Sequence, residues 1–382
     1  MRISNCFRFV FGKVLCCVNK NLKLIPVISL IFILPAFTSF SQGVDDEKDL
    51  ISDSTEVLNV DFYQNWELFD DDNPLALSLA FNTRTFKKEK YEAEKMPAVL
   101  SVHLKDTIIK KDIKIKARGE FRRGYCQFPP IKLNLKKTDF TSEYMEDQTT
   151  LKFVTHCKNY KLFESYILQE YLIYKMYNIL TDMSFQVRLV QMEYIDTQEK
   201  DKPFVKYGFI IEHINSVAER NNSLRIKSEK LAQNLMDKNM MALVALFEFM
   251  IGNTDWSVTG LHNMKIIKSK DFTKHEPFPV PYDFDYSGMV NARYAIPSEI
   301  LEIESVRERK YWGVCLPEEN IMNAKAIFLS RKNSLYKLVQ EFPYLEKSPK
   351  REMVDYLDSF YRILDSDYLF KREIISGCDE AR

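Results

Sequence analysis

Four oxygen-bearing side chains in the second half of the sequence have the types and spacing that phosphate chemistry needs. Asp255 ends the tetrapeptide Gly-Asn-Thr-Asp, and Asn263 follows it eight positions later. Asp283 and Asp285 close a second motif, Pro-Tyr-Asp-Phe-Asp. Carboxylate and amide oxygens bind hard divalent cations, so Asn263 with one or both later aspartates can hold such an ion. Asp255 is then free to orient or deprotonate an attacking hydroxyl, as phosphoryl transfer requires.

The elements around these motifs must bring them together. Asp255 and Asn263 lie in a polar loop between an apolar helix, expected over residues 228–251, and a strand expected over 264–267. The two aspartates end a second strand, expected over 278–282. A β-hairpin of these strands places Asn263 beside the aspartates. Each fragment alone also fits a structural role, since Asn-Thr-Asp is common in caps and turns, but their order together favours a functional site.

The rest of the chain predicts an α+β protein. Alternating apolar and polar residues predict strands over 75–81, 99–104, 113–117, 131–135, 186–195 and 205–212. Such alternation is typical of an antiparallel sheet with one solvated face. The spacing is helical over 160–180, and two or three helices are expected from about residue 317 onward. The order is therefore mostly β with one helix, then mostly α with a short hairpin.

The N-terminus has the features of an export signal. Residues 1–41 carry five basic residues and no acidic one, with an apolar run over 24–37. At about 1.5 Å per residue this run spans about 21 Å, less than the hydrocarbon core of a bilayer. Small residues precede Gln42, so we expect a cleaved signal peptide, with an uncleaved anchor as the alternative. We therefore expect a periplasmic, cell-envelope or secreted protein with an acidic linker over 42–74 and no stable membrane span after cleavage.

Composition and cysteine spacing disfavour several function classes. The 54 Lys and Arg residues balance 54 Asp and Glu residues without a recognisable nucleic-acid-binding module, so no nucleic-acid partner is expected. GxSxG and HExxH patterns are missing, which disfavours serine hydrolases and zinc proteases. After residue 41 the cysteines form no CxxC pair, so zinc is not expected. An oxidising compartment permits one or two disulfides, and the sequence does not choose their pairing.

These motifs resemble those of the spore-coat protein H (CotH) kinase family and, more remotely, those of HipA-type and lipid kinases. The matching segments run in the family's order, at 116–119, 130–135, 207–212, 252–255 with Asn263, and 281–285. The resemblance implies a two-lobed atypical protein-kinase-like fold, with a β-rich N-lobe containing one helix over 75–214 and a mainly helical C-lobe over 215–382. It also implies that ATP binds between the lobes with Mg²⁺ or Mn²⁺.

The resemblance assigns roles to the residues of the two Asp motifs. It makes Asp255 the catalytic aspartate and Asn263 and Asp283 metal ligands. Asp285 is a further candidate ligand.

The resemblance also predicts the residues that contact the nucleotide. We expect Lys132 to meet the phosphates and to pair with Glu170 on the helix, with Lys136 and Glu164 as the alternatives. We expect Arg118 and Gly119 to shape the loop over the nucleotide, although Arg118, Arg122 and Arg123 could instead steer an acidic partner. The backbone beside Glu212 is expected to meet adenine, and the alternative for Glu212 is a residue at the edge of the sheet.

The expected function is transfer of the ATP γ-phosphate to a Ser/Thr hydroxyl of an unidentified protein acceptor in the cell envelope. The eight-position interval between Asp255 and Asn263 is longer than related kinases commonly use, and ATP is scarce outside the cytoplasm. These two departures leave a catalytically inactive envelope or surface binding protein as the alternative, and a metal-dependent phosphohydrolase as a further one. Beside Asn263, His262 is expected to pack under Trp256.

Overall fold

The computed structural model describes residues 68–69, 71–92, 94–104, 107–135, 150–228 and 231–378. The expected signal peptide over 1–41, most of the expected linker over 42–74, and Lys136 lie outside these residues. Across the described ranges, no helix combines the length and the apolar character needed to cross a membrane.

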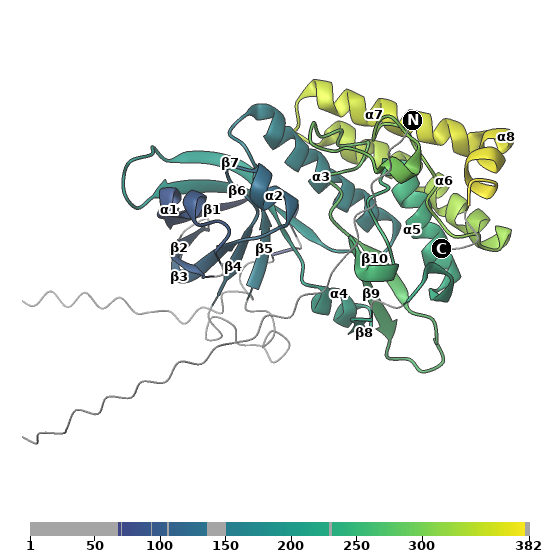
Figure 1. Cartoon of the computed structure of the whole chain (residues 1–382), viewed down its shortest axis with the longest axis horizontal. Coiled ribbons are helices and arrows are strands. Elements are labelled where there is room, and N and C mark those ends of the chain that lie inside the picture. The colour runs from purple at the N-terminus through teal and green to yellow at the C-terminus, as the bar shows by residue number, and fades with distance from the viewer. Residues whose placement is uncertain are drawn as a thin grey trace, which may run out of the picture. The chain divides into compact units, whose positions relative to one another are not determined.

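A closed barrel of seven strands occupies the first half of the described chain, in the order β1-β2-β3-β4-β5-β7-β6 (Figure 1). Neighbouring strands are antiparallel except β1 and β6, which pair in parallel from Leu75 opposite Val190 to Phe81 opposite Asp196. The strands are β1 (Leu75–Phe81), β2 (Met96–His103), β3 (Ile108–Ala117), β4 (Ile131–Asn134), β5 (Thr150–Val154), β6 (Val187–Asp196) and β7 (Phe204–Ile211).

Alternation along each strand fills the barrel. In β3, Ile113, Ile115 and Ala117 join the barrel core, while the lysines between them lie on the outer face. All six strands that alternation predicted in this region are present. The sequence patterns did not single out β5, which is an additional strand between β4 and β7.

The barrel overturns the expected fold class, an α+β two-lobed kinase-like fold with a β-rich N-lobe and a mainly helical C-lobe. The parallel pairing of β1 with β6 closes the sheet on itself. The described residues from Leu68 onward also belong to one compact unit. The physical reason for the error is that alternation sets the two faces of each strand but not which strands become neighbours.

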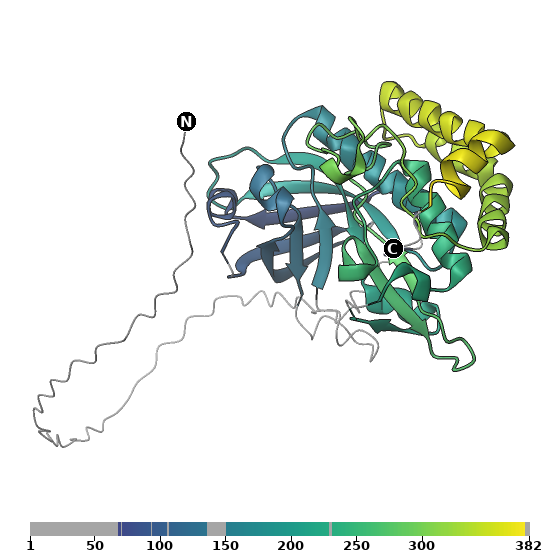
Figure 2. The same ribbon diagram turned by 45° about the vertical axis from the view of Figure 1, so that its right-hand side comes forward.

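A long helix, α3 (Lys161–Leu180), lies between the barrel and a helical region (Figures 1 and 2). It confirms the helix expected over 160–180. Two short helices, α1 (Thr83–Lys88) and α2 (Phe121–Tyr125), lie within the barrel half of the chain. The helical region contains α4 (Ile214–Arg220), α5 (Lys238–Ile251), α6 (Glu318–Glu341), α7 (Lys347–Asp365), α8 (Asp367–Phe370) and a π-helical turn at Lys371–Ile375.

A small sheet in the order β10-β9-β8 accompanies these helices. It consists of β8 (Ser223–Ile226), β9 (Met264–Ser269) and β10 (Phe278–Pro281). The expected hairpin is confirmed, because β9 and β10 are antiparallel with Met264 opposite Pro281. Short 3-10 turns cover Gln233–Leu235, Thr259–Leu261 and Glu299–Leu301.

Two disulfides join segments that are distant in the sequence. Cys126 is bonded to Cys157, which links the end of α2 to the segment between β5 and α3. Cys315 is bonded to Cys378 and ties the chain before α6 to the C-terminal end of the described residues. The structure therefore supplies the pairing that the sequence left open.

Candidate functional site

Glu170, Asp283 and Asp285 form an acidic cluster between α3 and the end of β10. Each side chain offers a carboxylate oxygen, and these oxygens lie within 4.8 Å of one another. Asp283 has a left-handed φ of 68°, and its backbone N–H donates to the Tyr174 hydroxyl at 2.8 Å. The structure thus brings two of the expected metal ligands together with Glu170, which was expected to contact the cofactor.

Arg122 of α2 neutralises part of this acidic cluster. Its Nε donates to Oδ2 of Asp285 at 2.8 Å, and its Nη2 donates to Oε2 of Glu170 at 2.7 Å. Burial outweighs the charge of Arg122 and raises the pKa of Glu170 to about 8, and burial raises the pKa of Asp285 as well. The cluster therefore contains more carboxylates than one guanidinium can keep ionised.

The expected ion pair between Lys132 and Glu170 is not formed. Arg122 binds Glu170 instead, and Lys132 is exposed on the outer face of β4. The alternative partner, Glu164, binds Lys206 at 3.2 Å and accepts a hydrogen bond from the Tyr207 N–H at 2.8 Å. Strand alternation places Lys132 on the outer face of β4 but carries no information on where α3 crosses the barrel.

Lys152 of β5 lies near the acidic cluster, and the sequence patterns did not single it out. It is directly opposite Lys132 in the β4–β5 pairing, so both side chains leave the barrel on the outer face. Burial, followed by the charges of Arg118 and Lys265, lowers the pKa of Lys152 to about 8, while Asp283 acts in the opposite direction. Leu151 and Phe153, which flank Lys152 and are buried, were the available signal for this strand.

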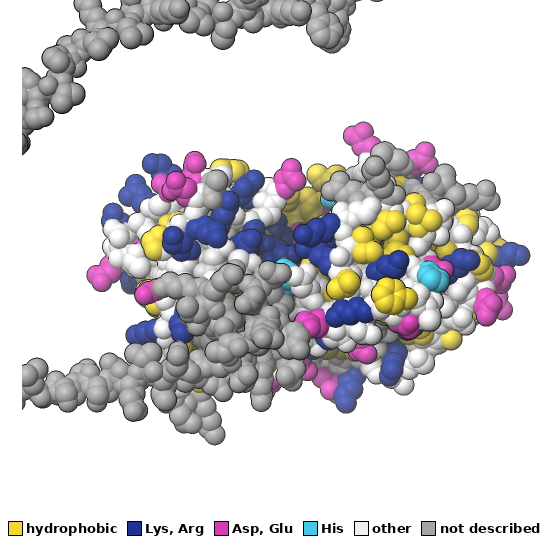
Figure 3. Space-filling model, turned by 90° about the horizontal axis from the view of Figure 1, so that it is seen from below, with side chains coloured by type: hydrophobic (Ala, Val, Ile, Leu, Met, Phe, Trp, Pro, Cys, Tyr) yellow, Lys and Arg dark blue, Asp and Glu magenta, His cyan; other side chains and the backbone are white. Residues whose placement is uncertain are grey.

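A cationic face surrounds Lys152, and Figure 3 shows Lys and Arg side chains gathered along the middle of the molecule in this view. We define the cationic face as Arg118, Lys132, Lys152, Arg225 and Lys265, which are joined by strand register or by their effect on Lys152. Like charges that face each other destabilise a protein. The cationic face is therefore suited to an anionic ligand.

Arg118 and Gly119 lie where β3 turns into α2. The Arg118 N–H donates to the Pro130 carbonyl at 2.8 Å, and Gly119 has a φ of 85°. Glycine adopts this conformation at no steric cost, which explains its use at the turn. The same short segment thereby carries Arg118 of the cationic face and Arg122 of the acidic cluster. Contact of Arg118 and Gly119 with a nucleotide stays a prediction.

The loop after α5 is anchored by buried polar contacts. Gly252 ends α5 with a left-handed φ of 67°. The buried Asn253 donates from Nδ2 to Oε2 of Glu248 at 2.9 Å, and its Oδ1 accepts from the Asp255 N–H at 3.1 Å. Burial raises the pKa of Glu248 to about 8. These contacts fix the backbone from which the Asp255 side chain projects.

Asp255, His262 and Asn263 form a hydrogen-bonded group at the end of that loop. Nδ2 of Asn263 donates to the Asp255 carbonyl at 2.7 Å and to Oδ2 of Asp255 at 3.0 Å. Nε2 of His262 lies 2.8 Å from Oδ1 of Asp255, and its side chain is 59% exposed. The expectation that His262 packs under Trp256 is therefore wrong, and the histidine contacts the predicted catalytic aspartate.

Two links join this group to the acidic cluster. The Tyr282 N–H donates to the Asn263 carbonyl at 3.0 Å, one residue before Asp283. Burial, followed by the charges of Asp285 and Asp255, raises the pKa of Tyr286 to about 12. Tyr286 is thus within electrostatic range of both aspartates. The structure brings Asp255, Asn263, Asp283 and Asp285 into one region, as the hairpin predicts.

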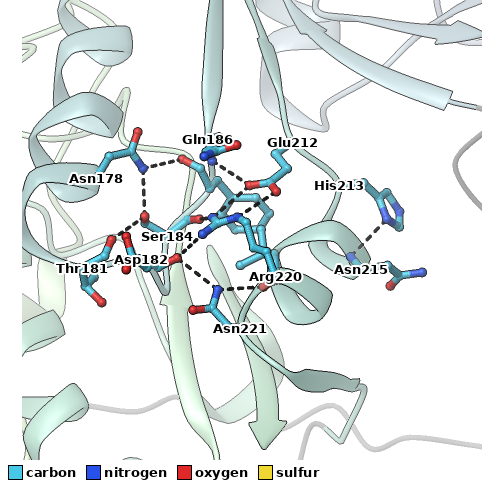
Figure 4. Close-up of polar contacts among 12 residues, drawn as sticks. Asn178, Thr181, Asp182, Ser184, Gln186, Glu212, His213, Asn215, Arg220 and Asn221 are labelled. Atoms are coloured by element: carbon cyan, nitrogen blue, oxygen red, sulfur yellow. Dashed lines mark hydrogen bonds and ion pairs between the residues drawn. The ribbon is translucent and has the colours of Figure 1, made fainter. Parts of the chain in front are cut away.

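Glu212 is the centre of a buried polar network (Figure 4). Arg220 donates from Nε to Oε1 of Glu212 at 3.0 Å and from Nη2 to Oε2 at 3.1 Å. The Gln186 N–H donates to Oε2 at 2.9 Å, and the Glu212 N–H donates to the Gln186 carbonyl at 2.9 Å. Arg220 also donates to the carbonyls of Asp182 and Ser184. The side chain and amide of Glu212 are therefore used internally, which favours its structural role over the expected adenine contact.

The acidic cluster fits a hard divalent cation. All its donors are oxygens, which Mg²⁺ and Mn²⁺ prefer. Oε1 of Glu170 is buried and has no hydrogen-bond partner, and an unpartnered buried carboxylate oxygen is costly. Glu170 and Asp283 can hold the ion, and Asn263 can add its amide oxygen because its amide nitrogen already donates to Asp255.

Three kinds of group therefore meet at this site. A carboxylate cluster can bind a cation, a cationic face can bind an anion, and Asp255 can accept a proton. This combination suits the handling of a phosphate ester. Neither models of known protein families nor curated proteins match the sequence, so its resemblance to the spore-coat protein H kinases remains a prediction.

Proposed function

We propose that this protein is a phosphotransferase that moves the γ-phosphate of ATP to a Ser/Thr hydroxyl of a protein acceptor, with Mg²⁺ or Mn²⁺ as cofactor. One observation carries the proposal, namely that Lys152 and Lys265 both lie over the ring of Tyr282, with their Nζ atoms 5.7 and 4.7 Å from its centroid, directly before Asp283 of the acidic cluster. The triphosphate of ATP needs both groups beside it, because fixed positive side chains and a carboxylate-bound metal together neutralise its negative charge. Because the fold is a closed barrel, it does not support a relationship to the spore-coat protein H kinases, and the proposed relationship rests on the site motifs alone.

The residues would act in the following way. Asp255 accepts the proton of the acceptor hydroxyl, whose oxygen forms a bond to the γ-phosphorus. The bond from that phosphorus to the β–γ bridging oxygen breaks, and its electron pair leaves with ADP. Asn263 orients Asp255 through its two hydrogen bonds, and Lys152 offsets phosphate charge from the barrel side. When bound, the divalent cation would supply further charge neutralisation.

The proposal includes export to an oxidising compartment. Two disulfides support it, because such bonds are rare in proteins of a reducing cytoplasm. The acceptor would then be a periplasmic, envelope or extracellular protein.

A second candidate is an envelope binding protein that transfers no phosphate. The observation that favours it is the environment of Asp255, where Oδ1 contacts His262 and Oδ2 accepts from Asn263. With both oxygens engaged in this way, the Asp255 carboxylate is less accessible to a substrate hydroxyl than a free one.

Calorimetry and phosphate transfer test the proposal with two variants. Asp283→Asn should weaken Mg-ATP binding by at least about tenfold, because it removes a metal ligand. Asp255→Asn should leave binding within about threefold of wild type and should lower transfer of labelled phosphate by about 100-fold or more. Casein-type and envelope-extract proteins serve as first acceptors.

The outcomes separate the candidate functions. Wild-type protein that neither binds Mg-ATP or Mn-ATP nor labels any acceptor contradicts the proposal. Specific binding to an envelope protein that is unchanged in Asp255→Asn, without phosphate transfer, identifies the binding protein. Release of inorganic phosphate from ATP without an acceptor, abolished by Asp283→Asn, identifies a phosphohydrolase.

A further inference from the structure

A guanidinium already occupies one side of the acidic cluster. Arg122 contacts Asp285 through two nitrogens. In addition to the hydrogen bond from Nε, its Nη2, which also donates to Glu170, lies 2.8 Å from Oδ2 of Asp285. The three side chains are 9%, 1% and 7% exposed for Arg122, Glu170 and Asp285, so the contact is shielded from water. Buried charge pairs of this kind are strong in the folded protein and costly to leave half-made.

Helix α2 holds Arg122 in place from two sides. Cys126, directly after α2, is bonded to Cys157. At the other end the Phe121 ring lies 5.7 Å from the Tyr286 ring and 5.6 Å from the Tyr294 ring. Arg122 is therefore built into the site by the fold, unlike a surface arginine that changes partners freely.

The charges limit how many cations the site can accept. When a bound cation holds all three carboxylates in the ionised form, they and one guanidinium leave two negative charges, which one divalent cation balances. A second divalent cation would leave two positive charges among buried side chains, which is unfavourable. Arg122 takes Oε2 of Glu170 and Oδ2 of Asp285, which leaves Oε1 of Glu170 buried without a hydrogen-bond partner and open to a cation.

We propose that Arg122 is a resident cation that takes the place of a second metal ion. The site then holds one divalent ion, on Asp283 and Oε1 of Glu170, and Asp285 positions Arg122 instead of ligating metal. The inference rests on the proposed function for the identity of the ion. It concerns the number of ions, which is measurable without nucleotide or acceptor.

Titration with Mn²⁺, with free Mn²⁺ counted by electron paramagnetic resonance, tests this on the full chain with both disulfides intact. Wild type should bind one Mn²⁺ per chain. Arg122→Met should bind a second Mn²⁺, or bind the first at least about tenfold tighter, because the guanidinium no longer competes for the carboxylates. Arg123→Met is the matched control, since Arg123 is the next residue of α2 and lies over the Tyr91 ring, and it should behave as wild type.

Arg122→Met leaves two buried carboxylates without their cationic partner. A second, charge-matched comparison keeps the test valid if that variant does not fold. Arg122→Met/Glu170→Gln removes one charge of each sign and is compared with Glu170→Gln alone. The double variant should bind Mn²⁺ at least about tenfold tighter, because Asp285 becomes available to the ion. Equal affinity of the two variants overturns the inference.

Two results on wild type distinguish this inference from the proposed function. Binding of Mg-ATP together with two Mn²⁺ per chain overturns the resident cation and leaves the phosphotransferase in place. Absence of any bound Mn²⁺ overturns the resident cation, whereas the phosphotransferase is contradicted only when binding of Mg-ATP and Mn-ATP and labelling of acceptors are missing as well.

Discussion

Lys152 and Arg122 are cations beside the same aspartates, but the structure holds them differently. Arg122 donates to two carboxylates, whereas burial, followed by the charges of neighbouring cations, lowers the pKa of Lys152 to about 8. An anion that binds next to Lys152 relieves this repulsion. Arg122 therefore belongs to the internal charge balance of the protein, and Lys152 is available to a ligand.

Replacing Lys152 should weaken nucleotide binding specifically. We expect Lys152→Met to lower the affinity for Mg-ATP by about tenfold or more, because a charge-assisted contact to phosphate is lost. Lys132→Met is the matched control, since Lys132 is the directly opposite residue of β4 and is exposed. Calorimetry should give a change of less than about threefold for the control. Equal losses for the two variants would contradict the assignment of Lys152.

The lowered pKa of Lys152 also predicts a pH dependence. Since that pKa is about 8 and phosphate favours the ammonium form, binding of Mg-ATP near pH 8 should take up protons at Lys152, while metal binding releases a proton from Glu170, whose pKa is also about 8. Wild type should therefore take up more protons than Lys152→Met. The affinity should fall as the pH rises above about 8, because the proton must then be regained on binding. Calorimetry in buffers of different ionisation enthalpy measures the uptake. Proton uptake that persists unchanged in Lys152→Met would assign it to another group.

At this scale, residues in loops next to strongly patterned elements were predictable. Asp255 follows a long apolar helix, Asn263 precedes a short strand and Asp283 follows the next strand, so their proximity could be inferred from chain order. Arg122 could not be paired with Glu170, because they are 48 positions apart and meet only through packing. His262 was also misjudged, since no local pattern distinguishes a packed histidine from one that contacts Asp255.

Among the elements, α2 has the largest influence relative to its size. It is five residues long, yet it carries Arg122, packs the Phe121 ring edge-to-face against Tyr286 and ends at a disulfide. A helix this short has no stability of its own, so these tertiary contacts hold it. The position of Arg122 is therefore sensitive to the Cys126–Cys157 bond.

Removing that disulfide should affect both stability and the metal site. We expect Cys126→Ser/Cys157→Ser to lower the free energy of unfolding by roughly 2–5 kcal/mol. We also expect it to change Mn²⁺ affinity, because Arg122 is no longer held over the carboxylates. Cys315→Ser/Cys378→Ser is the control, and it should lower stability without changing Mn²⁺ affinity. Denaturant titration and Mn²⁺ titration check this, and an equal effect of both pairs on Mn²⁺ would refute it.

The same tertiary contacts limit what the sequence could predict about elements. The helix expected over 228–251 begins only at Lys238, because the Asp237 side chain accepts a hydrogen bond from the Met240 N–H at 2.8 Å and caps it there. In strand β5, Val154 is buried directly after Phe153 and breaks the alternation of Leu151 and Phe153, and the strand's partners β4 and β7 are supplied by the barrel.

For the whole molecule, closure of the barrel depends on close backbone approach at Gly208. This residue of β7 lies opposite Val190 of β6, on the side of the barrel where β5 also pairs. A Cβ at Gly208 would lie 2.5 Å from Cζ of Phe153 and 2.6 Å from the Val154 carbonyl oxygen. The backbone oxygen cannot move away without disturbing β5.

Gly208→Ala should therefore destabilise the protein as a whole. We expect the free energy of unfolding to fall by about 1–3 kcal/mol, as overpacking of a core does. Gly124→Ala in α2 is the control, because its nearest contact is the Tyr91 hydroxyl at 3.3 Å, at the end of an exposed side chain. Urea denaturation should show little change or slight stabilisation for the control. If Gly208→Ala unfolds with an unchanged free energy, the backbones of β5 and β7 move apart at this point at no cost, which contradicts the prediction.

Barrel closure was also the feature that sequence patterns could not supply. The outward lysines and inward aliphatic residues of β3 fit an open sheet and a closed one equally well. What decides between them is the parallel pairing of the first and sixth strands, which are more than a hundred positions apart. The net charge is equally uninformative about the site. The chain is neutral overall, but its fold separates the charges into a cationic face and an acidic cluster.

Because each barrel strand has a neighbour on both sides, the barrel offers no strand edge to another polypeptide. In the described part of the chain, the free edges belong to the small sheet, whose outer members are β8 and β10. All four residues of β10 are buried, whereas Leu224 of β8 is 61% exposed. An extended acceptor of the proposed phosphotransferase would therefore add its backbone hydrogen bonds at β8, the strand that carries Arg225 of the cationic face.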